Sequence, residues 1–515
     1  MKFRKLLISA ILIGILFSTA AFAADGSSDA KETVSYADPA DFAGKTVAMV
    51  IGGTAESILA EHFPDAIPAY YSSSADSVMA VVAGKADAVL SDDVVLYQSI
   101  VKDPSLRLIP VNVPPDRLAP IFQKNEKGEA LAAQYNEFLA AYKAGPEYEK
   151  DKTKWIAGTD GEKVFDDPSD IPDVNGTLVI ATTGSIPPAS IIVDGEIRGF
   201  EVEIMREFCR AYGYRPEFVT VDLSAIITGV TTGKFDIGST GFSITEERKK
   251  SVLFGDPYLD VRVSLMVKDA EASAQESFFD QVSAGFQRTF LAENRWQMFV
   301  SGILTTVLIT VLSIVLGTLA GFGLYLLCRN GDPAVNRVTG FFRWFITGMP
   351  VVVFLMVLFY VVFAKSSLSG EAVAVVGFAL LFGFSVFDML KNGEAAIEEG
   401  QKEAAYALGY GNLDTYLRII FPQALRHILP VYESEVVSLL KATAVVGYVA
   451  VVDLTKVGDL IRGRTYDAFF PLLAVVAGYF LISAVMKWIL HRATAIINSG
   501  SAGKMAFLTA FIKEE

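Results

Sequence analysis

The stretch that decides the fold is a polar insert between two long apolar segments: Gly400-Gln401-Lys402-Glu403-Ala404-Ala405-Tyr406-Ala407-Leu408-Gly409. Because the apolar segments on either side are long enough to cross a membrane, the insert is expected outside the bilayer. The triplet Glu403-Ala404-Ala405 begins a helix with small residues on one face, and Gly409 allows the positive φ that ends it. A second short helix around 414–420 is predicted to stop at Pro422, which has no N–H to donate. The sequence therefore predicts a compact helix–glycine–helix knob, able to enter a groove on another protein.

Around this knob, the second half of the chain is strongly apolar. Hydrophobic residues make up 52% of the sequence, more than is typical of a soluble enzyme. A single apolar stretch could be a buried soluble core, but several in succession predict a polytopic helical membrane domain. Within one of them, Thr347-Gly348-Met349-Pro350 predicts a kink. About five stretches have membrane-spanning length, at 298–327, 341–364, 371–390, 430–452 and 468–490.

The N-terminal residues 1–23 are typical of a signal peptide: a basic start, an apolar run, and small residues before a cleavage site at Ala21-Phe22-Ala23. A retained first span is the alternative. Residues 24–41 are small and polar, as in a linker. The net charge of −14 lies mostly in the first part of the chain and argues against nucleic acid as a partner.

Residues 42–165 and 172–268 each alternate short β-rich runs with helices, as in α/β lobes that bind ligands at the carboxyl ends of parallel strands. The second range contains Gly241-Phe242-Ser243-Ile244-Thr245-Glu246-Glu247-Arg248 and later Asp256-Pro257-Tyr258. It closely resembles lobe 1 of the family-3 extracytoplasmic solute-binding proteins for polar amino acids. The first range, with Gly44 to Glu56 and Gly84 to Asp92, resembles lobe 2. The lobes thus stand in permuted order, as one clamshell or as two truncated copies.

The resemblance implies a site for a free amino acid, whose two charges must both be paired when buried. In it, Arg248 would take the α-carboxylate, together with Ser243, the Thr54 hydroxyl and backbone N–H groups near Gly241. Asp92, from the other lobe, would take the α-ammonium. Without the resemblance, Arg248 would be interpreted as part of a solvated helix face. The family's aromatic residues around its Pro-Pro pair are replaced in Ile186-Pro187-Pro188-Ala189, which leaves the solute's side chain open.

The segment 296–493 resembles permeases of the histidine and glutamine type in ABC importers, and its loop 398–430 resembles their EAA loop. In that family the loop docks into a cytoplasmic ATPase, and an ordinary connecting helix is the alternative. The sequence has no Gly-x-x-x-x-Gly-Lys-Ser/Thr, so ATP hydrolysis is assigned to a separate ABC ATPase dimer. The residues implied in coupling are Glu403, Ala404, Ala405, Gly409 and Pro422.

We therefore expect a multi-domain chain with a two-lobed clamshell outside a bacterial cytoplasmic membrane, an amphipathic linker at 269–295, the permease domain among lipids, and a cytoplasmic tail at 494–515. The partners expected are a small solute, the ATPase, and a second permease subunit or a second copy of the chain. No catalytic residue, metal or cofactor is expected. A ligand-gated channel or sensor with the same clamshell is the alternative function, and a membrane-anchored enzyme is disfavoured because no nucleophile–base or metal constellation is present.

Overall fold

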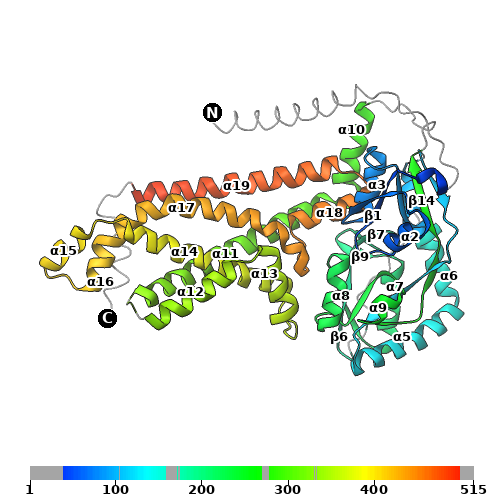
Figure 1. Cartoon of the computed structure of the whole chain (residues 1–515), viewed down its shortest axis with the longest axis horizontal. Coiled ribbons are helices and arrows are strands. Elements are labelled where there is room, and N and C mark those ends of the chain that lie inside the picture. Colours follow the sequence, from blue (N-terminus) through cyan, green and yellow to red (C-terminus); the bar gives the residue numbers. More distant parts are fainter. Residues whose placement is uncertain are drawn as a thin grey trace.

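The structure, a computed structural model, describes residues 39–103, 105–157, 171, 174–268, 278–329, 331 and 333–498. An α/β domain and an elongated helical domain follow one another along the long axis of the molecule (Figure 1). The expected combination of an α/β clamshell and an all-α polytopic domain is confirmed. The expected signal peptide, most of the linker and the tail beyond residue 498 lie outside the described residues.

The α/β domain has two lobes, numbered from here on in the order in which the chain enters them, so the first lobe begins in the range that resembles lobe 2 of the solute-binding family. This first lobe is built on a sheet with the strand order β2-β1-β3-β14-β4. The apolar run that forms β1 is almost completely buried and pairs in parallel with β2 and β3. Helices α2, α3 and α4 connect these strands. The bounds are β1 (Thr46–Val50), α2 (Ala55–His62), β2 (Ile67–Tyr71), α3 (Ser74–Val82), β3 (Ala88–Asp92), α4 (Asp93–Lys102), β4 (Leu106–Pro110) and β14 (Val263–Lys268).

The second lobe is built on a sheet with the order β10-β6-β11-β5-β12, and β13 also pairs with β5. The aromatic residues of α5, α7 and the turn at Thr153–Ala157 form its core, in which Tyr135, Trp155 and Phe208 are fully buried. Its elements are β5 (Asp116–Phe122), α5 (Glu126–Ala144), α6 (Pro146–Lys152), β6 (Thr177–Thr182), β7 (Ser185–Ile186), β8 (Ser190–Val193), β9 (Glu196–Arg198), α7 (Phe200–Tyr212), β10 (Arg215–Thr220), α8 (Leu223–Thr232), β11 (Ile237–Ser243), α9 (Glu246–Lys249), β12 (Leu253–Phe254) and β13 (Leu259–Val261).

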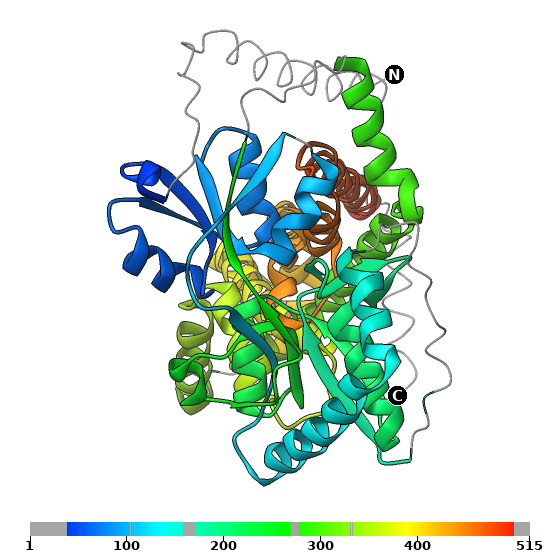
Figure 2. The ribbon, with the colours of Figure 1, turned by 90° about the vertical axis from the view of Figure 1, so that its right-hand side faces the viewer.

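The ranges 42–165 and 172–268 were expected to form separate lobes, but the sheet of each lobe contains strands from both ranges. Strand β5, within 42–165, pairs antiparallel with β11 and β12 of the second lobe. Strand β14, within 172–268, pairs antiparallel with β3 and β4 of the first lobe. The chain therefore crosses between the lobes twice, and the two ranges form one two-lobed unit rather than two truncated copies (Figure 2).

Among the described residues of the helical domain, three helices are long and apolar enough to cross a membrane: α11 (Trp296–Arg329), α14 (Gly370–Ala395) and α19 (Phe469–Asn498). Two bent helix pairs also qualify, which gives five spans if each pair counts as one. This number agrees with the about five spans predicted from the sequence. Helix α11 can pack closely on α14 because Gly321 has no side chain. A Cβ at this position would lie only 2.3 Å from the Gly383 carbonyl oxygen.

The first bent pair joins α12 (Pro333–Thr347) to α13 (Val351–Val357), which continues as a π-helical turn at Leu358–Val362. The two arms meet at 108°. Pro350 stands at the N-cap of α13, where its missing N–H breaks no helical bond. The kink predicted at this position is confirmed.

The second bent pair corrects the prediction that a helix stops at Pro422. Helix α16 (Asn412–Thr415) runs through a π-helical turn (Tyr416–Ile420) into α17 (Phe421–Ala442), and a 3₁₀ turn (Thr443–Val449) follows. Pro422 stands in the first turn of α17, a position that proline commonly takes, directly after the π-helical turn. Helix α18 (Leu454–Thr465) then leaves at 52° and contacts β7 and α3 of the clamshell.

Candidate functional site

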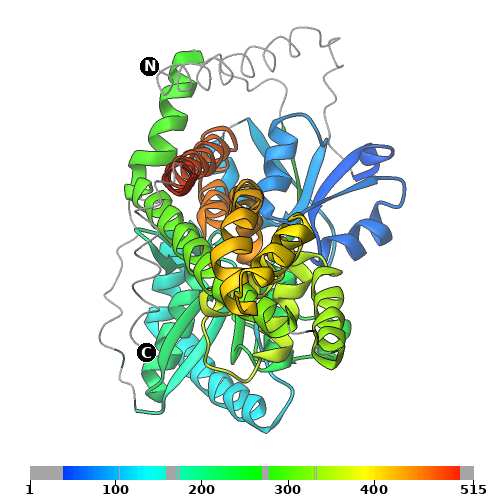
Figure 3. The same cartoon turned by 90° about the vertical axis from the view of Figure 1, so that its left-hand side faces the viewer.

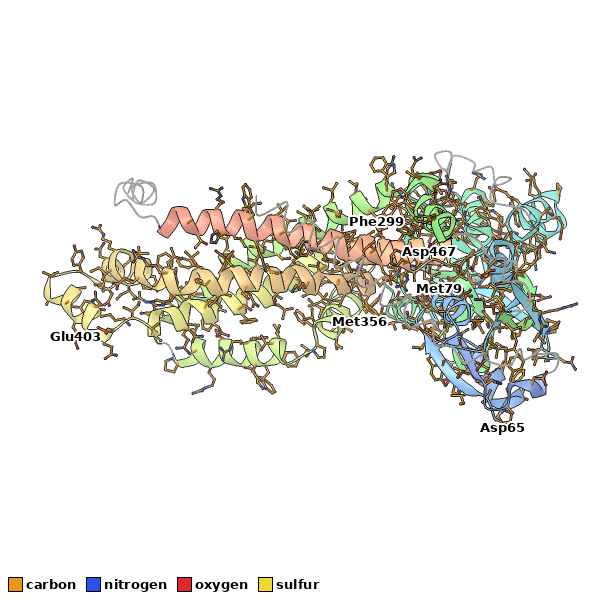
Figure 4. The ribbon with its side chains drawn as sticks, turned by 90° about the horizontal axis from the view of Figure 1, so that it is seen from above. Asp65, Met79, Phe299, Met356, Glu403 and Asp467 are labelled. Atoms are coloured by element: carbon orange, nitrogen blue, oxygen red, sulfur yellow. The ribbon has the colours of Figure 1, made fainter. Side chains whose placement is uncertain are left out.

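The two sequence-predicted sites lie at opposite ends of the molecule. Figure 4 shows Glu403 at the tip of the helical domain and Asp65 of the clamshell at the far end. Helix α15 (Glu399–Ala407), which carries Glu403, faces the viewer in Figure 3. One site is a cleft between lobes, and the other is an exposed knob.

The cleft brings all five predicted binding residues to the wall of one cavity of about 100 Å³. Thr54 and Asp92 come from the first lobe, from the N-cap of α2 and the end of β3. Gly241 and Ser243 end β11 of the second lobe, and Arg248 lies in α9, whose N-cap Thr245 accepts a hydrogen bond from the Arg248 N–H at 3.2 Å. The cavity is smaller than the roughly 300–1,000 Å³ of pockets that hold drug-sized ligands.

Arg248 bridges the two lobes. Its Nη1 donates to the Ser243 carbonyl oxygen at 3.0 Å, and its Nη2 donates to the Gly52 carbonyl oxygen at 2.6 Å. Gly52 follows β1 with a φ of +77°, a conformation that favours glycine, so this turn can present its carbonyl to the other lobe. The guanidinium fork of Arg248 therefore stands where a carboxylate entering the cleft would meet it.

Hydroxyl and carboxylate groups complete the polar side of the cleft. The Thr54 hydroxyl donates to Asp116 Oδ2 at 3.2 Å and lies 3.4 Å from the Ser243 hydroxyl oxygen. Asp116 begins β5, at a crossing between the lobes. It was missed in the sequence because it stands outside the quoted motifs; its place directly after Pro114-Pro115, before an apolar strand, is the only local signal.

Asp92 and Arg248 are oppositely charged groups of the cleft, and each affects the pKa of the other. Burial, together with the negative charges of Asp116 and Asp93, raises the pKa of Asp92 to about 7, although Arg248 opposes the rise. An ammonium group placed beside Asp92 would favour its ionised form and lower this pKa. The cleft thus offers a cation for a carboxylate and a titratable carboxylate for an ammonium.

The aromatic residues expected beside the Pro-Pro pair are replaced by rings from elsewhere. Ile186, Pro188 and Ala189 line the cleft, as do Phe200, Phe242 and Tyr258. The rings of Phe200 and Tyr258 contact each other with centroids 6.0 Å apart. The apolar side of the cleft is therefore partly aromatic despite the altered motif.

Glu201 is a second buried carboxyl that the sequence did not single out. It is fully buried in α7, and its Oε2 accepts a hydrogen bond from the Gly241 N–H at 2.6 Å. Burial raises the pKa of Glu201 to about 7, although the hydrogen bond from the Gly241 N–H acts to lower it. Glu201 therefore supports the end of β11 from behind the cleft. The Gly241 N–H is already engaged in this hydrogen bond.

The knob at the other end matches the predicted helix–glycine form. Glu403, Ala404 and Ala405 lie in α15, and Gly409 follows it with a φ of +85°. Ala405 is buried at 2% exposure, whereas Glu403 and Ala404 are exposed. The small residue thus packs inward, and the acidic residue is presented at the surface.

Glu394 ties the knob to the membrane helices. It accepts hydrogen bonds from the Tyr325 hydroxyl of α11 and lies 3.0 Å from Lys402 Nζ and 3.6 Å from Arg329 Nε. The Arg329 guanidinium covers the ring of Tyr416 at 4.0 Å from its centroid. One carboxylate therefore connects α11, α14 and α15.

Comparisons with known proteins find relatives for both domains. Residues 178–417 match the bacterial extracellular solute-binding proteins, family 3, from β6 onward. Over 195 residues the chain is 28% identical to a putative glutamine transport system permease protein of Rickettsia bellii, which covers 37% of this chain and 88% of the relative. It is 27% identical to the L-cystine transport system permease protein of Bacillus subtilis, over 36% of this chain and 80% of the relative.

Among solved structures, an amino acid ABC transporter with histidines matches 43% of this chain and 99% of its own, with 25% identity and a TM-score of 0.37. A solute-binding clamshell joined to permease-like helices defines a transporter subunit rather than an enzyme. This chain contains a family 3 solute-binding domain and is related to the permeases of amino acid ABC transport systems.

Proposed function

We propose that the chain is the permease subunit, with a built-in solute-binding domain, of an ATP-driven ABC importer for amino acids or similar small solutes. The observation that carries the proposal is the meeting of Thr54, Asp92, Gly241, Ser243 and Arg248 at one cleft, in a chain whose opposite end carries an exposed EAA-type helix. Relatives named for glutamine and cystine transport support a polar amino acid as the solute.

In this proposal the cleft pairs both charges of the amino acid. Arg248 takes the carboxylate, helped by the hydroxyls of Ser243 and Thr54, and Asp92 takes the ammonium. The bond of Arg248 to the Gly52 carbonyl oxygen keeps the empty lobes closed. A ligand carboxylate replaces that carbonyl, so the lobes must part slightly to admit it.

The knob transmits ATP-driven movement from a separate ABC ATPase. Its exposed Glu403 enters the ATPase, and Glu394 passes the movement on to α11 and α14 through Tyr325, Arg329 and Lys402. The clamshell lies on the outer side of the cytoplasmic membrane, and the knob lies on its cytoplasmic side. One set of five spans makes half a pore, so a second copy of this chain or a second permease subunit completes it.

The test is transport by the full chain in proteoliposomes, together with the ABC ATPase that co-purifies with it. Glutamine, arginine and cystine are offered outside, with ATP inside. Uptake that needs ATP and is stopped by vanadate supports the proposal. Amino acid binding with passive, vanadate-insensitive flux would instead favour a ligand-gated channel, and the absence of any associated ATPase would refute the importer.

A further inference from the structure

A second cavity lies between the clamshell and the helical domain. Its volume is about 290 Å³. It is bounded by α3 of the first lobe, by the turns before β7 and α8 of the second lobe, and by the 3₁₀ turn at Thr443–Val449 and α18 of the helical domain. We call it the interface cavity.

The interface cavity shares a wall with the cleft. Val50, Ser74, Ile186 and Leu223 line both spaces. The first two belong to the first lobe and the last two to the second lobe. Because the wall is made of side chains from both lobes, and three of the four are apolar and uncharged, parting of the lobes opens a direct route between the two spaces.

The interface cavity carries charges of both signs, held in ion pairs. Lys456 Nζ of α18 lies 2.8 Å from Asp222 Oδ1 of the second lobe. Arg462 of α18 pairs with Asp76 of the first lobe and lies 3.5 Å from Asp459 of its own helix. The Lys456 and Arg462 side chains are only 8% and 15% exposed. Each lobe is therefore fastened to α18 by one ion pair; the Asp76 side chain is 19% exposed and the Asp222 side chain 40%.

This combination suits a solute with two opposite charges. Burying a zwitterion is favourable only where both of its charges find partners. The two cations of α18 can exchange a lobe carboxylate for the solute's carboxylate, and the released lobe carboxylates can then accept its ammonium. An uncharged solute could not take the place of either partner in these ion pairs, and a purely anionic solute would leave the released lobe carboxylates without a partner.

We propose that the interface cavity is a second solute site, which receives the zwitterionic amino acid as it leaves the cleft. Its carboxylate lies against Lys456 and Arg462, and its ammonium against the released lobe carboxylates Asp222 and Asp76. Occupation replaces the ion pairs between the lobes and α18, so arrival of the solute also loosens the clamshell from the helical domain. This inference rests on the proposed function, because it takes the ligand of the cleft as its own.

Thiol protection in the full chain, held in nanodiscs, tests the two sites separately. Both native cysteines, Cys209 and Cys328, are buried, at 0% and 8% exposure. Ala55→Cys places a thiol in the cleft, Ala444→Cys in the interface cavity, and Ser251→Cys on an exposed turn as control. Glutamine and arginine are each titrated against modification by a small thiosulfonate, which forms a mixed disulfide with the thiol and releases a sulfinate; cystine is left out because its own disulfide would exchange with the thiol. We expect protection at positions 55 and 444 and none at 251.

Arg462→Gln then identifies the charge that matters. It should raise the half-protecting concentration at position 444 by about tenfold, the change that about 1.4 kcal/mol produces, and leave that at position 55 nearly unchanged. Arg462→Lys should restore most of the protection. Intact protection at position 55 shows that each variant is folded.

Protection of position 55 alone would overturn the second site and leave the proposed function standing. An equal shift at both positions in Arg462→Gln would also overturn it, because the effect would then come through the cleft. Failure of both amino acids to protect either position would refute amino acid binding itself, and the second site with it.

Discussion

The cleft and the knob are both small polar sites, but the chain builds them in opposite ways. In the cleft, Arg248 bonds to Gly52, 196 positions earlier in the sequence, and the functional groups face inward. The knob is a continuous stretch whose acidic Glu403 faces outward. A substitution in the cleft removes a partner from a buried charge, whereas one in the knob changes a surface offered to another chain. Binding and coupling should therefore be separable by mutation.

The largest effect is expected for Arg248→Ala. Removing one partner of a buried, hydrogen-bonded charge pair costs about 2–5 kcal/mol, which weakens amino acid binding roughly 30-fold or more. Isothermal titration of the full chain measures the change in Kd. Lys249→Ala is the matched control, because Lys249 lies in the same helix but pairs with Glu246 on the surface. Equal losses in both variants would mean that α9 acts through its overall charge and not through the Arg248 fork.

Glu403→Arg should give the converse result. A groove that accepts a carboxylate repels a guanidinium, so ATP-driven uptake should fall by about tenfold or more, which corresponds to about 1.4 kcal/mol of lost docking. Amino acid affinity should stay within about twofold, since the cleft lies at the other end of the molecule. The measurements are vanadate-sensitive uptake and Kd on the same preparation. A parallel fall in affinity would break the proposed separation of the two sites.

Both sites could be predicted in outline because their residues belong to recognisable local motifs. The five cleft residues were chosen from three stretches, and the structure brings them to one cavity; their role in binding stays a prediction. Asp116 was not found because no motif includes it and only the pairing of β5 with β11 brings it to Thr54. Strand pairing over such distances is not encoded in local periodicity.

The knob shows the same limit in another form. Its helix and the positive φ of Gly409 follow from local sequence, and both are present. The continuation of the helix through Pro422 was not predicted, because a proline in a first helical turn cannot be told from a helix stop without the preceding π-helical turn. Glu394 was also missed, since its partners come from two other helices, α11 and α15.

A smaller, pH-dependent effect should distinguish the cleft from the knob. Because the pKa of Asp92 is about 7 in the empty cleft and a bound ammonium lowers it, binding releases a proton at lower pH. Affinity should be constant above about pH 8 and fall by at most about tenfold per pH unit below about pH 7. Titrations across this range in wild type and Asp92→Asn provide the measurement, and the variant should bind weakly with a flat profile.

Glu201 supplies the control for this profile, because its pKa is also about 7 but it does not line the cleft. Glu201→Gln keeps an acceptor for the Gly241 N–H, so it should retain the pH dependence. If the affinity of Glu201→Gln did not depend on pH while that of Asp92→Asn still did, the titrating group would be Glu201, which supports β11, and not Asp92 in the cleft wall.

The smallest effect is expected where the knob is fastened to the helices. Lys402 pairs with Glu394 at 3.0 Å with 33% of its side chain exposed, and such a pair contributes about 0.2–1 kcal/mol. Lys402→Met should therefore lower ATP-driven uptake by at most about fivefold, with amino acid affinity unchanged. Arg418→Met is the control, because the ion pair of Arg418 among the described residues is local, with the exposed Asp414 four positions earlier. A loss as large as that of Glu403→Arg would mean that Lys402 contacts the ATPase directly, so that the knob presents both charges to its partner.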